Sequence, residues 1–255
     1  MTIEVRNLSF SYGRHQVLKD ISFTVGPGEL VAVLGANGTG KSTLFRCILG
    51  TNKKHAGQVR LDGEDISLMS RKAVAAKLAY IPQTSESTFN YTVLQSVLMG
   101  ITNRLGVFGR PDSAHADAAM EALDTFGIAH LAHCGCNEIS GGERRLSLLA
   151  RAVVQRADTI IMDEPAANLD YGNQSLVMKN ISALADSGYA VILSSHDPNQ
   201  VFQYCTRTMA ISDGGIIFDG PPDSVLTEST LSGMYGVKVG RHRLHGENTS
   251  VFLVN

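Results

Sequence analysis

The segment from Gly35 to Thr43 constrains the fold of this chain more than any other. Two glycines, Gly35 and Gly40, flank four free positions and are followed by Lys41 and Ser42, which is the pattern of a phosphate-binding loop. A short apolar run precedes the loop, as in a buried strand, and a helix-like segment that ends at a glycine follows it. This order of strand, loop and helix predicts an α/β fold built around a bound polyphosphate.

Each part of this loop has a physical role in binding phosphate. Glycines allow consecutive backbone N–H groups to point at the anion, and the positive end of the following helix faces it. We expect Lys41 to hold the outer phosphates as a point charge and Ser42 to ligate magnesium. A glycine-rich turn without a ligand is the alternative, and it leaves the full match unexplained. The candidate phosphate-binding residues are Gly35, Asn37, Gly38, Gly40, Lys41, Ser42 and Thr43.

Composition excludes several classes of protein. The 255 residues carry a net charge of −2, with 22 basic and 24 acidic side chains, which does not indicate a nucleic-acid-binding surface. The first ten residues contain charges and lack the apolar core of a secretory signal, and no stretch reaches the ~18 consecutive apolar residues of a membrane-spanning helix. We therefore expect a soluble, cytoplasmic protein with reduced thiols.

Histidines and cysteines gather between positions 130 and 136. Their spacing matches no standard zinc pattern, so we do not expect a metal there. The residues are His130, His133, Cys134 and Cys136.

Alternating apolar and polar residues in the first thirty positions predict two or three antiparallel strands. Tyr12 ends the first of them, and an aromatic ring at this place can stack on a base. The simpler interpretation is an exposed tyrosine at the end of a strand.

Polar residues follow three further buried strands, at 78–81, 160–162 and 190–193. Ligands bind at the carboxyl ends of strands in open α/β sheets. We expect Asp163 to bind magnesium through its water, and Glu164 to orient or deprotonate the attacking water. Gln83 and His196 lie at the same predicted edge, which favours a catalytic role over a structural one.

Residues 140–143, Ser-Gly-Gly-Glu, begin a long amphipathic helix. Ser140 and Glu143 have the spacing of a capping box, and from spacing alone this is only a well-capped helix. Its glycines, Gly141 and Gly142, cost stability unless something must approach the backbone closely.

The segment from Ser87 to Asn103 is uncharged and rich in apolar residues. It is either core or a groove for a partner, and we favour the groove because one amphipathic helix buries only part of such a set.

Taken together, these motifs resemble the ATP-binding subunits of ABC transporters in order and spacing, over residues 1 to about 236. The motifs are Gly35–Thr43, Gln83, Ser140–Glu143, Ile160–Glu164, Asn168–Asp170 and His196. Within the family, the chain looks most like the ATPases of importers for iron-siderophore, haem and cobalamin, although molybdate and other metal importers share parts of the pattern. The narrower likeness is carried by Val97–Gly100, Gly172–Gln174, His196–Gln200 and Tyr235–Val237.

The resemblance implies a P-loop NTPase fold with a RecA-like core, an N-terminal antiparallel β subdomain and an inserted α-helical subdomain. The core with its β subdomain is expected at 1–86 and 158–236, the helical subdomain at 87–157, and a C-terminal extension at 237–255. In the extension, 251–254 is expected to pair with 237–244 as a hairpin around 245–248. His242 and His245 lie in this extension, and we expect a solvent-exposed tail rather than a metal sensor.

The resemblance also implies a head-to-tail dimer that encloses two ATP molecules and Mg²⁺. Each ATP is expected to lie on one phosphate loop, with Lys41 in a catalytic position and Tyr12 stacked on the adenine, and to face the Ser140–Gly142 helix start of the other copy. Further roles implied at the interface are magnesium and water sensing by Gln83, a terminal-phosphate contact by His196, and a contact of Asp170 with the opposite subunit.

A membrane permease is expected to dock near Ser87–Asn103, with a substrate-binding protein as an indirect partner. The chain is then a peripheral ATPase at the cytoplasmic face of the cell membrane that energises import of a metal chelate or cofactor. Two alternatives stay open: an ATPase for another metal or oxyanion importer, and a soluble ABC ATPase such as an iron-sulphur assembly factor. A phosphate-loop kinase is disfavoured, because it gives Ser140–Gly142 and His196 no role.

Three positions depart from the usual family pattern: Ile139 for leucine, Glu143 for glutamine, and Ala167 for serine or threonine. A carboxylate that points at a phosphate is costly. We therefore expect Glu143 to fold back onto the Ser140 backbone N–H as the partner in the capping box. We assign no consequence to Ala167.

Overall fold

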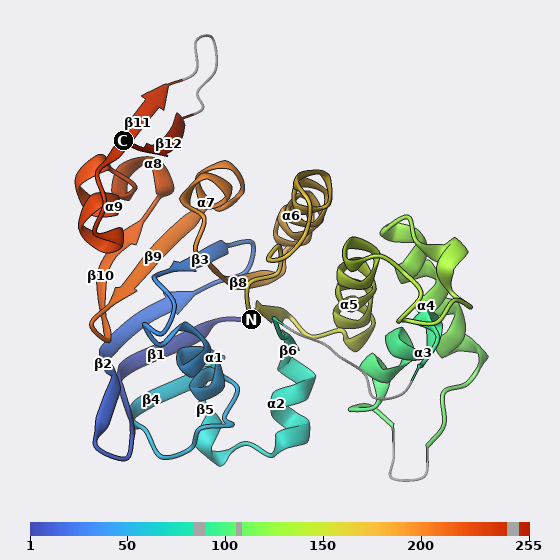
Figure 1. The fold of residues 1–255 in the computed structure, drawn as a ribbon. Coiled ribbons are helices and arrows are strands. Elements are labelled where there is room, and N and C mark those ends of the chain that lie inside the picture. The colour runs from blue at the N-terminus through green and yellow to red at the C-terminus, as the bar shows by residue number, and fades with distance from the viewer. Residues whose placement is uncertain (84–89, 106–108, 244–249) are drawn as a thin grey trace.

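The computed structural model describes residues 1–83, 90–105, 109–243 and 250–255. Its centre is a six-stranded sheet in which five neighbouring strands are parallel and β10 is an antiparallel edge strand (Figure 1). In spatial order the strands are β10 (Gly215–Gly220), β9 (Arg207–Ser212), β3 (Leu30–Leu34), β8 (Ala190–Ser195), β7 (Thr159–Met162) and β6 (Leu78–Ile81).

A four-stranded antiparallel sheet lies beside this central sheet. Its order is β2 (His15–Val25), β1 (Ile3–Tyr12), β4 (Ala56–Leu61) and β5 (Glu64–Asp65). Helix α1 (Lys41–Ile48) contributes buried side chains such as Leu44 and Phe45 to the core shared by both sheets. The alternation of the N-terminal segment therefore produces one buried face, as period-two patterns do.

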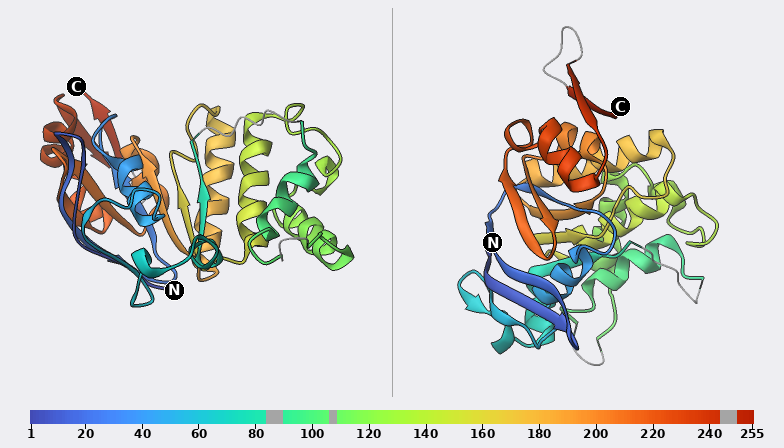
Figure 2. Two further views of the ribbon diagram at one scale, coloured as in Figure 1. Left: turned by 90° about the horizontal axis from the view of Figure 1, so that it is seen from below. Right: turned by 60° about the vertical axis from the view of Figure 1, so that its left-hand side comes forward.

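Helices cover the opposite face of the central sheet and extend into a lobe of their own (Figures 1 and 2). They are α3 (Val93–Leu98), α4 (Ser113–Thr125), α5 (Gly141–Gln155) and α6 (Tyr171–Asp186). Helix α6 begins at Tyr171, because Asp170 caps it by accepting a hydrogen bond from the Asn173 N–H at 2.9 Å.

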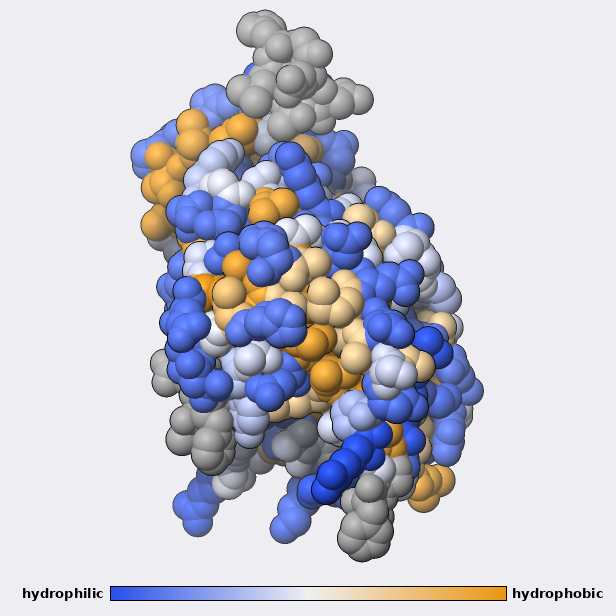
Figure 3. Space-filling view, turned by 90° about the vertical axis from the view of Figure 1, so that its right-hand side faces the viewer, coloured by the Kyte–Doolittle hydropathy of each residue, from blue (hydrophilic) through white to orange (hydrophobic). Residues whose placement is uncertain are grey.

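The structure shows where the apolar residues of the uncharged segment 87–103 go, from Asn90 onward. Val93, Val97 and Ile101 are fully buried in the helical lobe, and Leu94 and Leu98 pack against the same core. Figure 3 shows apolar and small side chains gathered near the centre of the outer face of this lobe, with polar residues around them. The described part of the segment is mainly core, which corrects the preference for a groove formed by it; residues 87–89 lie outside the described residues.

The C-terminal third adds α7 (Pro198–Tyr204), α8 (Pro222–Val225) and α9 (Glu228–Tyr235). The predicted hairpin is confirmed: β11 (Val239–Arg243) pairs antiparallel with β12 (Ser250–Val254), while 244–249, with His245 and the predicted turn, lies outside the described residues. The α/β architecture with an antiparallel N-terminal sheet is also confirmed. Among the described helices, none combines the length and apolarity needed to cross a bilayer.

Candidate active site

The phosphate loop connects β3 to α1, as the sequence predicts. Gly38 and Gly40 have φ angles of 84° and 107°, a region that side chains with a Cβ rarely adopt. At Gly40 a Cβ would also approach Val17 and Leu18 of β2 to 3.0 Å. The glycines thus allow a tight loop that leads directly into the N-terminus of α1.

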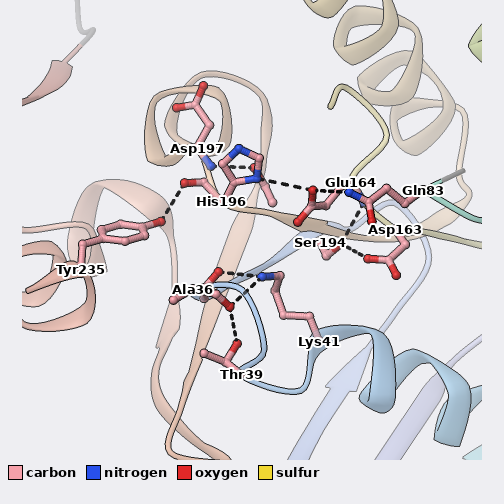
Figure 4. A network of polar contacts seen from close by, with 12 residues as sticks. Ala36, Thr39, Lys41, Gln83, Asp163, Glu164, Ser194, His196, Asp197 and Tyr235 are labelled. Carbon is pink, nitrogen blue, oxygen red and sulfur yellow. Dashed lines mark hydrogen bonds and ion pairs between the residues drawn. The ribbon is translucent and has the colours of Figure 1, made fainter. Parts of the chain in front are cut away.

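Lys41 is the first residue of α1, and its side chain turns back into the loop. Its Nζ donates hydrogen bonds to the carbonyl oxygens of Gly35 (2.7 Å) and Ala36 (3.1 Å), as Figure 4 shows. Burial lowers the pKa of the ammonium group, although the nearby carboxylates of Glu164 and Asp163 favour its charged form. An ammonium group has three protons, so Lys41 can donate one more hydrogen bond to an anion in the loop.

Two carboxylates follow β7 and are held by a serine of the neighbouring strand β8. The Ser194 hydroxyl donates to Asp163 Oδ1 at 2.5 Å and accepts from the Glu164 N–H at 2.9 Å. The register that aligns Met162 with Leu193 places these residues side by side. Ser194 is completely buried, and Asp163 is nearly so. Sequence reasoning missed Ser194, because nothing local distinguishes it from other serines in buried strands.

Glu164 contacts two other predicted site residues, Gln83 and His196. Its Oε2 accepts a hydrogen bond from Gln83 Nε2 at 2.9 Å and lies 3.6 Å from His196 Nδ1 (Figure 4). The backbone of Glu164 has a φ of 45°, a conformation that non-glycine residues rarely adopt and that often occurs at functional sites. The strand ends therefore bring Gln83, Glu164 and His196 together as predicted.

These side chains border the phosphate loop. A cavity of about 310 Å³ is lined by Gly38, Gly40, Lys41, Ser42 and Thr43 together with Asn37, Gln83 and Glu164. A second cavity of about 310 Å³ adjoins it and is lined by Asn37, Gln83, Glu164, His196 and residues of 165–168. Cationic, hydroxyl, amide and carboxylate groups thus surround one space, which suits a phosphate anion with a hard cation.

Tyr12 lies at the end of β1, where the sequence predicts it. Its hydroxyl accepts a hydrogen bond from Asn52 Nδ2 at 3.2 Å, and its ring packs edge-on against Phe10, with 4.8 Å between the centroids. Almost half of the Tyr12 surface is exposed, at 47%. The ring is therefore fixed by contacts at its edge and hydroxyl and still available to a ligand.

The start of α5 has the capping box that the sequence predicts. The Ser140 N–H donates to Glu143 Oε2 at 2.8 Å, and the Glu143 N–H donates to Ser140 Oγ at 3.3 Å. Hydrogen bonds to the Glu143 carboxylate from the Ser140 side chain and from its backbone N–H lower the pKa of the Glu143 carboxyl, because they favour its charged form. The Glu143 charge is thus satisfied within its own helix turn.

The structure supplies an internal reason for one of the paired glycines. A Cβ on Gly142 would lie 2.3 Å from Asn173 Oδ1 on α6, closer than atoms can approach. Asn173 also donates from Nδ2 to Asp170 Oδ2 at 2.6 Å. The group that approaches the backbone at Gly142 is therefore the Asn173 side chain of α6. Sequence reasoning assigned no such contact to Asn173. Ser140, Gly141, Gly142 and Asp170 line neither cavity beside the phosphate loop.

Among the described residues, no three His, Cys, Asp or Glu side chains come together in a way that could hold a metal ion. Cys136 is buried, and burial raises the pKa of its thiol. The residues that could hold Mg²⁺ at the phosphate loop are of mixed type: the Ser42 hydroxyl, the Gln83 amide and the Asp163 carboxylate.

Comparison with known proteins decides the family. The sequence profile of the ABC transporter family matches residues 18–167, more than half of the chain. The chain belongs to the ABC transporter family. It is an ATPase of this family, whose ATP-binding domains hydrolyse ATP to drive transport.

Several relatives of this ABC ATPase have names that state a transport role. A Helicobacter pylori protein named "Probable iron chelatin transport ATP-binding protein" is 33% identical over 237 residues, covering 92% of this chain and 93% of its own. The hemin import ATP-binding protein HmuV of Rhodococcus jostii is 34% identical over 248 residues, covering 96% and 84%. A solved structure described as "An inward-facing conformation of a putative metal-chelate type ABC transporter" has a TM-score of 0.88 and 29% identity, covering 100% of this chain and 97% of that chain.

Proposed function

We propose that this ABC ATPase energises the import of a metal chelate or related cofactor, of the iron-siderophore, haem or cobalamin type, through a membrane permease. The names of the iron chelatin and hemin relatives and the metal-chelate transporter structure support this substrate class. The observation that carries the ATPase part is the contact of Glu164 with Gln83 and His196 at the edge of the Lys41 cavity.

The residues of the cavity suggest how Mg²⁺-ATP binds. Gly35, Asn37, Gly38 and Gly40 supply backbone around the phosphates, and Lys41 and Thr43 lie at the start of α1, where anions are stabilised. Ser42 and Gln83 line the cavity and offer oxygen ligands to Mg²⁺, and the third is the carboxylate of Asp163, which is buried next to Glu164 and does not line the cavity. The cation neutralises phosphate charge when it is bound. Tyr12 stacks on the adenine.

Glu164 is the proposed base that orients or deprotonates the attacking water. Gln83 and His196 both approach the same oxygen atom of its carboxylate, Oε2, so a water bound there lies next to all three side chains. His196 contacts the terminal phosphate and maintains the position of the water. Lys41 stabilises the negative charge that develops on the phosphate oxygens.

We propose that a second copy completes the site. Within one chain, Ser140–Gly142 and Asp170 lie on the starts of α5 and α6 and do not line the phosphate-loop cavities. The capping box uses the Glu143 N–H, whereas the N–H groups of Gly141 and Gly142 belong to the first helical turn, which leaves donors for an external anion. In a head-to-tail dimer these donors face the ATP of the partner, and Asp170 contacts the opposite subunit.

We also propose that the ATPase is a peripheral protein at the cytoplasmic face of the cell membrane, where its permease docks near residues 87–103. A largely apolar groove of about 460 Å³ lies next to this segment and includes Leu49, Ile66, Met69, Val74, Leu78 and Tyr80. Asn103 connects the segment to the groove, since its Nδ2 donates to the Ala75 carbonyl oxygen at 2.9 Å. Leu68, 83% exposed, lies in the turn that precedes α2 (Arg71–Lys77). A substrate-binding protein is the indirect partner that delivers the cargo.

We propose that the core is formed by residues 1–86 and 158–236 and the helical unit by 87–157.

Replacement of Glu164 tests the catalytic assignment. Glu164→Gln should abolish turnover, preserve ATP binding and trap a closed dimer, which gel filtration with ATP detects. The wild type should show turnover per chain that rises with protein concentration. Normal turnover in Glu164→Gln, or turnover per chain that is constant at concentrations too low for dimerisation, would contradict the proposal.

A charge substitution separates a transporter ATPase from a soluble one such as an iron-sulphur assembly factor. Leu68→Glu should leave the ATPase activity of the isolated protein unchanged and reduce transport in proteoliposomes with the permease. Ile217→Glu, at an exposed position of β10 (49% exposed), is the matched control and should leave both unchanged. Identical transport by both variants would reject this docking surface. Co-purified permease and its cargo distinguish metal-chelate import from import of another metal or oxyanion.

A further inference from the structure

The backbone at His196 is shaped by local bonds and by one contact from a distant helix. Locally, the Asp197 N–H donates to Ser195 Oγ at 3.0 Å, and Asp197 Oδ1 caps α7 by accepting from the Asn199 N–H at 2.8 Å. From outside β8 and α7, the Tyr235 hydroxyl donates to the His196 carbonyl oxygen at 2.9 Å (Figure 4). Tyr235 thus attaches α9 to the residue whose ring faces Glu164.

The Tyr235 phenol is suited to remain a donor. Burial raises the pKa of its hydroxyl, and the nearby negative charge of Asp197 raises it further. The group therefore stays protonated over the pH range in which an ATPase works. A neutral hydroxyl can donate to the His196 carbonyl oxygen throughout this pH range, although the hydrogen bond itself lies at the surface.

The C-terminal hairpin of β11 and β12 contacts α7 through hydrogen bonds and ring packing. Asn199 makes two reciprocal bonds with the backbone of β12: Oδ1 accepts from the Phe252 N–H at 2.7 Å, and Nδ2 donates to the Phe252 carbonyl oxygen at 3.2 Å. Phe252 also packs edge-on against Phe202 of α7, with 5.6 Å between the ring centroids. The Arg241 guanidinium lies over both rings, at 5.1 and 5.8 Å from their centroids.

Arg241 extends these contacts to α8 and to α9, the helix that carries Tyr235. Its backbone N–H donates to Glu228 Oε1 at the start of α9 at 2.7 Å, and its guanidinium pairs with Asp223 of α8. The hairpin, α7 and α9 are therefore connected to one another by named contacts. The described part of the extension thus packs against the fold through Arg241 and Phe252, while His242 is exposed, as expected.

We propose that Tyr235 is a positioning residue for His196, and that the β11–β12 hairpin supports it by fixing α7 and α9 relative to each other. The proposal rests on the catalytic role of His196 put forward above. The hydrogen bond fixes the direction of the His196 carbonyl, and through it the orientation of the Cα–Cβ bond that aims the imidazole at Glu164 and the terminal phosphate. Catalytic groups misplaced by a fraction of an ångström lose rate without losing binding.

A double-mutant cycle tests this proposal. Tyr235→Phe removes the hydroxyl and keeps the ring, so the C-terminal packing is retained. We expect kcat to fall about three- to tenfold, the factor that corresponds to one lost hydrogen bond, with the KM for ATP within about twofold of wild type. In a His196→Ala background the same substitution should change kcat by less than about 1.5-fold, because the side chain that Tyr235 positions is gone.

Tyr204→Phe is the matched control. Tyr204 lies at the end of α7, and its hydroxyl shares a hydrogen bond of 3.0 Å with Ser175 and not with His196. It should lower thermal stability about as much as Tyr235→Phe and leave kcat unchanged. Long time courses with γ-labelled ATP measure the residual turnover of the His196→Ala variants.

Each outcome of the cycle decides between the alternatives. An equal loss of kcat from Tyr235→Phe in both backgrounds, or no loss in either, would overturn the positioning role. Wild-type turnover in His196→Ala would instead refute the proposed role of His196 itself, which is a different result. If Tyr235→Phe does not fold, Asn199→Ala breaks the hairpin contact to α7 and the same cycle applies: a loss of kcat that disappears in the His196→Ala background supports the proposal, and an additive loss overturns it.

Discussion

Replacement of Ser194 by alanine tests whether one buried hydroxyl holds both acidic residues of the site. The hydroxyl donates to Asp163 Oδ1 and accepts from the Glu164 N–H, and it has no exposed surface. Ser194→Ala deletes both bonds and leaves a buried carboxylate oxygen and a backbone N–H without this partner. The Glu164 N–H belongs to a residue with a φ of 45°, so the bond also helps to maintain an unfavourable backbone conformation.

The two lost bonds set the size of the expected effect. A hydrogen bond to a charged group contributes about 1.5–3 kcal/mol, and an unsatisfied buried N–H costs about 1–3 kcal/mol. Relaxation and water entry recover part of this, so we expect the free energy of unfolding to fall by about 3 kcal/mol. For a chain of this size that corresponds to a decrease in Tm of roughly 6–12 °C. ATP turnover should fall by more than about tenfold, because Asp163 and Glu164 both lose their anchor.

Thermal and urea unfolding followed by circular dichroism measure the stability, and phosphate release measures the turnover. Ser147→Ala is the matched control: Ser147 is also buried, but its hydroxyl donates to the Arg144 carbonyl of its own helix at 2.8 Å. Its loss should cost less than about 1 kcal/mol, because such bonds within a helix contribute little. Equal Tm values and normal turnover for the Ser194 and Ser147 variants would refute the reasoning.

Three further predictions concern the start of α5. Gly142→Ala should lower the free energy of unfolding by about 1–2 kcal/mol, because the new Cβ meets the Asn173 side chain; urea unfolding of Gly142→Ala/Asn173→Ala should recover most of this loss, and no recovery would argue against the clash. Glu143→Gln should change ATP affinity and turnover by less than about tenfold, since the Glu143 charge is directed to Ser140, and a larger gain in either would show that the charge opposes ATP. The lowered pKa of Glu143 adds stability that is fully present above its unfolded value of 4.5 and is lost as the pH falls through the lower folded value. Urea titrations should therefore find the stabilities of the wild type and Glu143→Gln converging as the pH falls below 4.5.

The sequence by itself determined the local parts of the site. The phosphate loop depends on glycines and a lysine within nine positions, and the capping box depends on a serine and a glutamate three positions apart. In both cases the interacting groups are neighbours in the chain, so the spacing almost fixes the geometry. The strand ends at Gln83, Glu164 and His196 were predictable for a related reason, since parallel strands align their carboxyl ends at one edge.

Contacts between distant segments were decided only by the tertiary structure. Ser194 reaches Asp163 because the β7–β8 register aligns Met162 with Leu193, and a register is a property of the whole sheet. Tyr235 reaches His196 because α8 and β12 pack against α7, and α9, which follows α8 in the chain, carries Tyr235.

The location of the apolar residues between Asn90 and Asn103 was likewise decided by the tertiary structure. Their number suggested a groove, yet Val93, Val97 and Ile101 are buried among helices α4 and α5. An apolar side chain has the same chemistry whether it faces a partner or its own core. Only the position of the neighbouring helices, which the local sequence does not encode, determines which of the two surfaces is covered.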